Sequence, residues 1–238
     1  MTKWYLDCVD DAGNVCIVYW ARLGWMTYAS VLESRKGRIV QRSGMTRAPA
    51  PRIDGDDLRW QGLGLTLTMR RSAGRFQQAL HEGLQWTCEM PRAGVVIHRD
   101  ASEMRGLGYA EALEMTVAPW KLPIDELRWG RFGGHHSSVV WINWRGSNPL
   151  TLILNNGVLD RDAVVGDRAI TLDGATLDLS DDRNLRDANL GKTLSFLHFL
   201  PKRIAGAREQ KWCSRAELKR NGATVDSGWS IHELVKFA

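Results

Sequence analysis

The 238-residue sequence lacks the short motifs that mark several large enzyme classes. It contains no GxSxG nucleophile elbow, no phosphate-binding glycine loop, no HExxH helix and no dinucleotide-binding fingerprint. Hydrolase, kinase and dehydrogenase functions therefore lose their main support.

Cysteine is also scarce. The four cysteines, Cys8, Cys16, Cys88 and Cys213, form no CxxC pair and no Cys/His metal spacing. This pattern predicts reduced, mostly buried thiols, and it predicts no metal and no cofactor. Cys8 and Cys16 could face each other across a hairpin, but that spacing alone does not predict a disulfide.

Long runs of positive or of apolar residues are absent too. The net charge is +5, but the 32 Lys and Arg residues are scattered among 27 acids. Nucleic-acid binding usually needs a basic stripe, so we expect no nucleic-acid partner. The sequence also predicts no transmembrane segment and no signal peptide, and hence a cytoplasmic protein. Peripheral membrane contact and the oligomeric state stay open.

Tryptophan, in contrast, is abundant, with 11 Trp against 5 Phe and 4 Tyr. Its large apolar surface carries a single N–H donor, which suits β-sheet cores and the walls of apolar cavities. A chain of this length with 44% hydrophobic residues can bury a substantial core. The composition therefore predicts a folded chain with one large β domain or two smaller ones.

Strand patterns follow one another along the chain. Residues Trp4 to Val9 and Val15 to Trp20 flank a turn rich in Asp, Gly and Asn, which predicts a β-hairpin. Residues 62–69 alternate with a period of two. About fifteen short strands with this spacing predict an all-β barrel or sandwich with little helix.

Two windows are ambiguous, and one stretch marks a boundary. Residues 76–83 could start a short helix before a strand over 84–90. Residues 190–200 have a helix-like pattern, but their composition leaves the choice between helix and strand open. Pro119 and Pro123 bracket Trp120-Lys-Leu, which predicts a junction between two β lobes. We expect these lobes to span residues 1–118 and 119–238.

Polar and aromatic groups gather in two neighbouring stretches. Gly106-Leu-Gly-Tyr-Ala-Glu111 is followed about twenty residues later by Leu127-Arg-Trp-Gly-Arg-Phe132 and then by His135-His136. Both stretches lie among predicted strands, so their carboxylates, guanidinium groups and rings could converge on one cavity. Trp141, Asn143 and Arg145 share one face of a later predicted strand.

These stretches resemble a known family. Trp4-Tyr5-Leu6-Asp7, Gly108-Tyr109-Ala110-Glu111 and Trp129-Gly130-Arg131 are similar to segments of the carotenoid 1,2-hydratase and tocopherol cyclase superfamily of lipocalin-like (calycin) proteins. The resemblance implies two lipocalin-like antiparallel β-barrel or sandwich halves packed together around an apolar cavity. The sequence departs from the family after Glu111, where the family's His and Asn are missing. Carotenoid hydration is therefore not implied.

The resemblance also implies site residues. Glu111 stands at the family's Asp position and is the candidate acid, because burial in an apolar wall disfavours the charged form of a carboxyl group. Tyr109 and Arg131 are the other candidate catalytic residues, although Glu111 could instead form a structural pair with Arg131. Glu114 points to the opposite strand face. The candidate substrate-binding residues are Trp129, Trp141, Asn143, His135 and His136.

Each binding candidate also has a structural interpretation. His135 and His136 could be solvated turn residues, and Asn143 could bond to the neighbouring strand. Arg128 and Arg131 could form pairs with carboxylates across adjacent strands or stack on Trp129. His232, beside Glu233, fits an exposed strand position better than a catalytic one.

The leading functional hypothesis is a cofactor-independent biosynthetic enzyme of secondary metabolism. It would enclose an apolar polyene, terpenoid or polyketide and promote cyclisation, isomerisation or hydration by shape and one buried acid. The first alternative is a lipocalin-like carrier that binds a hydrophobic ligand without chemistry. The second is a β domain with a filled interior and no pocket.

Overall fold

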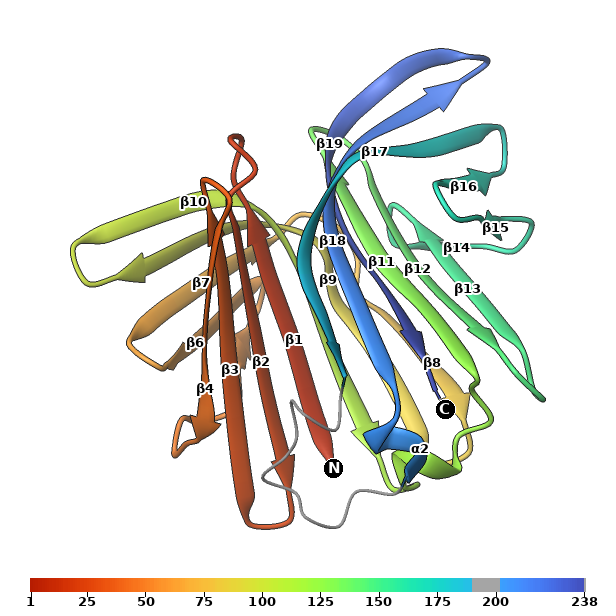
Figure 1. The fold of residues 1–238 in the computed structure, drawn as a ribbon. Helices are drawn as coiled ribbons and strands as arrows, with labels where there is room; N and C mark the ends of the chain where they lie inside the picture. The colour runs from red at the N-terminus through yellow and green to blue at the C-terminus, as the bar shows by residue number, and fades with distance from the viewer. Residues whose placement is uncertain (190–201, 238) are drawn as a thin grey trace. The chain divides into compact units, whose positions relative to one another are not determined.

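The computed structural model describes residues 1–189 and 202–237, most of which lie in antiparallel β-strands. The chain divides into two compact units, Met1–Val117 and Ala118–Ala238. Each unit is built on one curled antiparallel sheet (Figure 1), which confirms the all-β prediction. The helix-like window at residues 190–200 lies outside the described residues.

The first unit contains a ten-stranded sheet that begins in its middle. From β1 the chain runs outward through three hairpins to the edge strand β4, and it then builds the other half inward from β5. The last strand, β10, closes the sheet by pairing with β1. The strands are β1 (Thr2–Val9), β2 (Val15–Leu23), β3 (Met26–Arg35), β4 (Arg38–Met45), β5 (Arg52–Asp54), β6 (Asp57–Gly62), β7 (Leu65–Arg71), β8 (Phe76–His81), β9 (Leu84–Arg99) and β10 (Ser102–Met115).

The second unit repeats this strand order. Its nine-stranded sheet starts at the central strand β11, runs outward to β14, returns from the other edge and closes with β19 on β11. Each strand of the first unit except β8 has a counterpart at the same place in the second sheet. The sequence nevertheless shows no repeat of fixed period. The strands are β11 (Glu126–Gly134), β12 (Ser138–Arg145), β13 (Leu150–Asn155), β14 (Val158–Asp160), β15 (Val164–Val165), β16 (Ala169–Leu172), β17 (Ala175–Asn189), β18 (Arg208–Arg220) and β19 (Ala223–Lys236).

Helical structure is limited to short turns in the described part of the second unit. The 3-10 turn η1 (Pro119–Lys121) starts at one of the two prolines of the expected junction, and α2 (Lys202–Ala205) precedes β18. None of the helices within residues 1–189 and 202–237 has the length and apolar character needed to span a bilayer.

Alternating burial explains the strand pattern. In β7, Leu65, Leu67 and Met69 are buried, while the threonines between them are only partly covered. Their side chains join an apolar core in the first unit that also contains Trp20 and Trp60. A second apolar core, in the other unit, contains Phe132, Trp141, Ile153, Ile170 and Leu177.

Pro91 interrupts the longest strand of the first unit without ending it. The sequence predicts a strand over residues 84–90 that ends before Pro91, whereas β9 is continuous from Leu84 to Arg99. The pairing with β10 shifts register on both sides of Ala110. Pro lacks the N–H needed for a ladder hydrogen bond, so a bulge accommodates it. Residues 76–81 form strand β8 and not the start of a helix.

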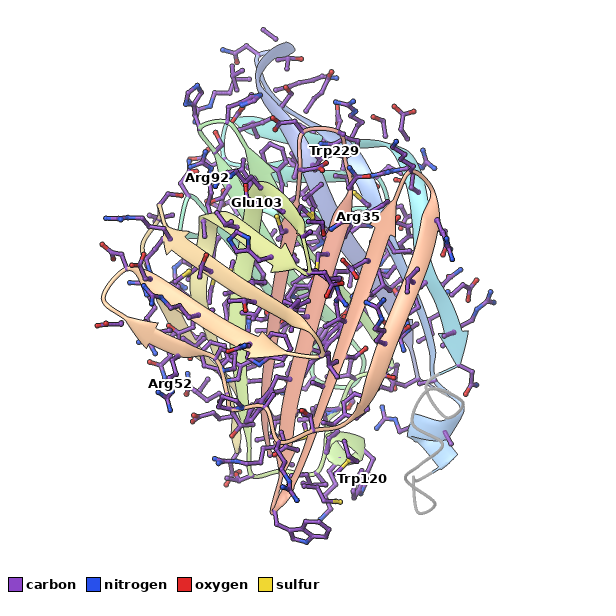
Figure 2. All side chains as sticks on the ribbon, turned by 90° about the vertical axis from the view of Figure 1, so that its left-hand side faces the viewer. Arg35, Arg52, Arg92, Glu103, Trp120 and Trp229 are labelled. Carbon is purple, nitrogen blue, oxygen red and sulfur yellow. The ribbon has the colours of Figure 1, made fainter. Side chains whose placement is uncertain are left out.

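Charged side chains protect the edges of the first sheet. Arg42 on β4 is exposed and lies 3.5 Å from Glu33, and Arg52 on β5 points into solvent (Figure 2). Charges on edge strands disfavour pairing with the edge of another molecule. All four cysteines are buried thiols, including the directly opposed pair Cys8 and Cys16.

Gly108 lies where β10 passes close to β1. A Cβ atom at this position would stand 2.0 Å from the carbonyl oxygen of Asp7 and 2.6 Å from a methyl carbon of Val95. The carbonyl belongs to the backbone of the neighbouring strand, so it cannot move aside without disturbing the pairing. Close strand approach explains the glycine before Tyr109.

We expect Gly108→Ala to lower the free energy of unfolding by about 1–3 kcal/mol, because the added methyl group overpacks the strand pair. Urea denaturation measures this change. Gly94→Ala is the matched control, since a Cβ at that position in β9 meets no atom within 4 Å. Equal stability of the two variants would contradict the explanation.

Candidate functional site

Glu111 lies in a buried polar cluster of the first unit. Its side chain is on β10, opposite Tyr5 of β1 and Cys88 of β9, and the residue is only 5% exposed. The Trp86 indole nitrogen and the Tyr109 hydroxyl each donate a hydrogen bond to the same Glu111 oxygen, Oε2, at 2.7 Å. Two donors on one oxygen fix the orientation of this carboxyl group.

The neighbours of Glu111 remain protonated. Burial, followed by the nearby Cys88 and Glu111, raises the pKa of Tyr109 well above its ordinary value. Burial and then the charge of Glu111 raise the pKa of the Cys88 thiol in the same direction. Tyr109 therefore acts as a neutral hydrogen-bond donor to Glu111.

The cluster lies on the sheet face away from the apolar core of its unit. Leu6, Met90 and Ala110 belong to that core, whereas Tyr5, Tyr109 and Glu111 alternate with core residues along their strands. The interior of the first unit is filled by apolar side chains. Tyr109 and Glu111 therefore do not point into it.

Arg131 and Trp129 lie on β11 in the second unit. Arg131 is buried and donates to the carbonyl oxygen of Trp229 at 3.0 Å. The ring centroid of Trp129, also buried, lies 5.5 Å from the ammonium nitrogen of Lys211. The Lys211 ammonium also forms an ion pair with Glu233. These two candidates thus lie among charged groups of their own unit.

His135 and His136 occupy a turn after β11 and are exposed. Their backbone N–H groups donate to the Asp226 carboxylate at 3.0 Å, as does that of Ser137 at 2.7 Å. Burial opposes the charge of Asp226, but hydrogen bonds from His136 and from the Ser227 backbone outweigh it and lower the pKa. The backbone of the turn is held by Asp226. The exposed imidazoles fit the interpretation of His135 and His136 as solvated turn residues.

Asn143 bonds to the neighbouring strand. Its side-chain nitrogen donates to the hydroxyl oxygen of Thr151 on β13 at 2.9 Å. Trp141, on the same face of β12, is buried and reaches a cavity. Trp141 therefore lines the cavity, whereas the side chain of Asn143 is held by the neighbouring strand.

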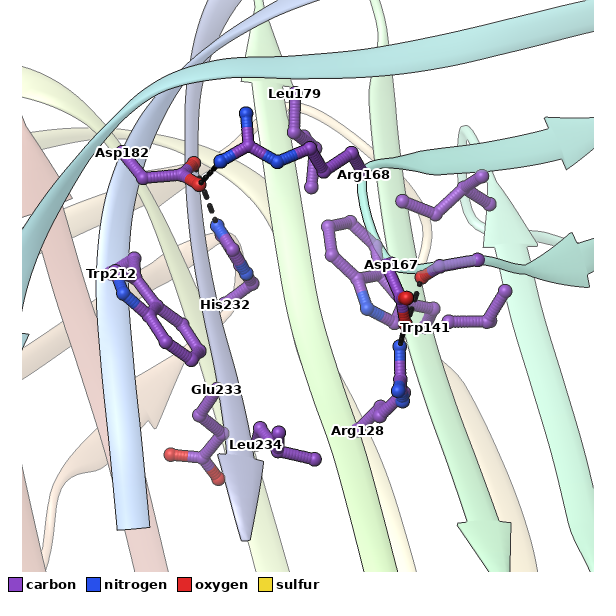
Figure 3. Close-up of a pocket in the computed structure, with 13 residues that line it drawn as sticks. Arg128, Trp141, Asp167, Arg168, Leu179, Asp182, Trp212, His232, Glu233 and Leu234 are labelled. Carbon is purple, nitrogen blue, oxygen red and sulfur yellow. Dashed lines mark hydrogen bonds and ion pairs between the residues drawn. The ribbon is translucent and has the colours of Figure 1, made fainter.

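The cavity that Trp141 reaches has a volume of about 310 Å³ and lies in the second unit. Its apolar lining includes Trp141, Trp212 and Leu179, and its polar lining includes His232 and Asp182 (Figure 3). This volume is at the lower end of the range for small-molecule sites.

Asp182, Ser214 and His232 are linked at this cavity. The Ser214 hydroxyl donates to Asp182 Oδ1 at 2.5 Å and lies 2.8 Å from His232 Nε2. The imidazole of His232 stacks on Trp212, with ring centroids 5.3 Å apart and planes at 24°. The expectation that His232 is an exposed strand residue is wrong, since only 13% of its side chain is accessible.

The imidazole of His232 is neutral near pH 7. Burial lowers its pKa from 6.5 to about 4, Asp182 opposes this shift, and the positive charges of Lys211 and Arg168 add to it. Arg168 pairs with Asp182 at 3.1 Å. Arg128, on the other side of the cavity, pairs with Asp167 (Figure 3) and also with Glu126.

Sequence reasoning did not find Asp182, Ser214 or Trp212. Asp182 lies on β17, and Trp212 and Ser214 lie on β18. Only the pairing of these strands with each other and with β19 brings the three residues beside His232. The alternation in β18 gives Trp212 and Ser214 the same face, but it does not identify their partners. Within residues 1–189 and 202–237, no group of three or more His, Cys, Asp or Glu could hold a metal ion.

Comparison with known proteins shows the fold alone. No family model and no curated protein matches this sequence. The crystal structure of CghA with Sch210972 matches with a TM-score of 0.65 at 10% identity, over 100% of this chain and 88% of that one. A candidate AttH protein from Nitrosomonas europaea gives 0.60 at 12% identity, over 100% and 93%. Kievitone hydratase from Nectria haematococca gives 0.60 at 8% identity, over 99% and 88%.

One of these solved structures is named as a hydratase. The chain shares its fold with these solved structures, and the all-β architecture expected from the sequence is thereby confirmed. The identities of 8–12% carry no site residue from those proteins to this chain.

The buried His232 should make the protein less stable in acid. The unfolded chain binds a proton near pH 6.5, whereas the folded chain binds it only near pH 4, so stability falls as the pH decreases between these values. The loss from this group is up to about 3 kcal/mol. We expect His232→Gln to flatten that slope in urea denaturation at a series of pH values. His136→Gln, an exposed control, should keep the wild-type slope.

Proposed function

We propose that this protein is a cofactor-independent enzyme that holds a mostly apolar small molecule and promotes its cyclisation, isomerisation or hydration. The observation that carries the proposal is the carboxyl group of Glu111, which is buried and oriented by Tyr109 and Trp86. A positioned acid or base within a water-poor site accelerates proton transfer to or from a carbon skeleton.

The fold supports the same class of function. Kievitone hydratase is named for a hydration, and one crystal structure of CghA contains Sch210972, a small molecule. A shared fold does not fix the reaction, so the substrate class is argued from the site. The buried aromatic rings of Trp86, Tyr109 and Tyr5 beside Glu111 favour a polyene, terpenoid or polyketide over a highly charged metabolite.

In the proposed mechanism, Glu111 exchanges a proton with the substrate. Tyr109 and Trp86 keep the carboxyl group in one orientation, and the neutral phenol of Tyr109 can stabilise the carboxylate that remains after proton donation. Binding of the substrate beside Glu111 in a reactive conformer would remove part of the entropic barrier.

We expect Glu111→Gln to lower turnover by about 100-fold or more, because the amide cannot donate or accept the transferred proton. The wild type and this variant are incubated with a metabolite extract of the source organism, and the products are followed by liquid chromatography and mass spectrometry. A product of unchanged mass indicates cyclisation or isomerisation, and a gain of one water indicates hydration.

Glu114→Gln is the matched control, because Glu114 lies on the same strand but is exposed. It should keep wild-type turnover. Tyr109→Phe should lose a smaller part of the activity, since Trp86 still orients the carboxyl group. Unchanged turnover in Glu111→Gln would refute its role. A wild type that retains a compound without converting it would instead support the carrier alternative.

A further inference from the structure

The hydrogen-bond pattern at the second-unit cavity fixes one tautomer of His232. Ser214 has a single hydroxyl proton, and Asp182 accepts it at 2.5 Å. The contact of 2.8 Å between Ser214 Oγ and His232 Nε2 must then be donated by the imidazole. The neutral ring therefore carries its proton on Nε2, and its basic lone pair is on Nδ1.

Nδ1 makes no hydrogen bond to any residue among 1–189 and 202–237. His232 lines the cavity, and Trp212 holds the ring in place by stacking. Ser214, in contrast, is fully buried, so its hydroxyl cannot attack a bound molecule. In this group, Ser214 and Asp182 position and polarise the imidazole, which is the part that reaches a ligand.

The charges around the cavity are paired. Arg128 binds Asp167 and Glu126, Arg168 binds Asp182, and Glu233 binds Lys211. An anionic ligand would have to compete with these carboxylates. The indole faces of Trp141 and Trp212 offer flat apolar contacts, which suit a neutral aromatic or unsaturated molecule.

We propose that His232 is a general base for a neutral aromatic or unsaturated small molecule bound in this cavity. Its Nδ1 takes a proton from an O–H group, or from a C–H group next to a carbonyl, and leaves the electron pair on the substrate. The imidazolium then returns the proton to another atom of the same molecule, so that the step is an isomerisation without a co-reactant. Asp182, acting through Ser214, stabilises the transient imidazolium.

This inference goes beyond the function proposed for Glu111, because the two sites share no residue. His232 is on β19, and the groups that face it are Asp182 on β17, Lys211, Trp212 and Ser214 on β18, and Arg168 before β16. The neutral state of His232 at pH 7 agrees with a base that is ready to accept a proton.

A nitrobenzisoxazole tests the inference without knowledge of the natural substrate. A base removes the proton from its ring carbon, the N–O bond breaks, and a coloured cyanonitrophenolate forms, so no co-reactant is needed. We expect the wild type to accelerate this ring opening and His232→Gln to lose about 100-fold of the protein-dependent rate. The wild-type rate should be constant from about pH 5.5 to 8, because the imidazole is already neutral there.

Controls separate this site from the other one and from unspecific catalysis. Glu114→Gln and His98→Gln, at exposed positions of the first unit, should react at the wild-type rate, whereas Asp182→Asn should lower kcat with little change in KM. No acceleration by the wild type, or equal rates for wild type and His232→Gln, would overturn the proposal. If Glu111→Gln kept wild-type turnover of a metabolite, the function proposed for Glu111 would fail. The nitrobenzisoxazole test of His232 would not be affected by that result.

A second measurement does not depend on the His232→Gln variant folding. Nitrogen NMR of histidine-labelled wild-type protein reports which ring nitrogen carries the proton. We expect a protonated Nε2 and a bare Nδ1 at pH 7, and a His232 signal that shifts when unsubstituted benzisoxazole, a neutral and far less reactive analogue, is added while those of His135 and His136 stay unchanged. A protonated Nδ1, or no shift of His232, would contradict the assignment.

Discussion

The pairing of the first strand of each unit with its last strand is the constraint on which both sites depend. β1 pairs with β10, and β11 pairs with β19, and each pairing joins segments about a hundred residues apart. The β1–β10 register places Glu111 opposite Tyr5, while the β11–β19 register places His232 opposite Gly130. Because side chains alternate along a strand, a slip of one residue would move Glu111 or His232 to the other face of its sheet.

Glycines allow these pairings to be close. Gly108 lets β10 approach the backbone of β1, and Gly130 leaves room for the indole of Trp141, which would otherwise stand 2.1 Å from a Cβ atom. The same Cβ would lie 2.8 Å from that of His232. Small residues on the central strands thus make space for the large side chains that shape the second-unit cavity.

Buried ionisable groups are tolerated here because each has partners from neighbouring strands. Glu111 accepts from an indole and a phenol, and Lys211 faces two carboxylates. An unpaired charge in these places would cost several kcal/mol. His232 meets the same constraint differently, by remaining neutral. In both sheets, the groups for which we propose proton transfer are groups that folding must desolvate.

The sequence by itself determined the all-β class, the opening hairpin and the prominence of Glu111 with Tyr109, because these depend on local alternation, turn residues and a short motif. It could not show that β9 continues through Pro91, since a bulge is defined by its partner strand. It also led to the wrong expectation for His232. Only the tertiary structure decided which residues meet at the cavity, because Asp182, Ser214 and His232 lie on three strands whose registers arise from long-range pairing and not from local propensity.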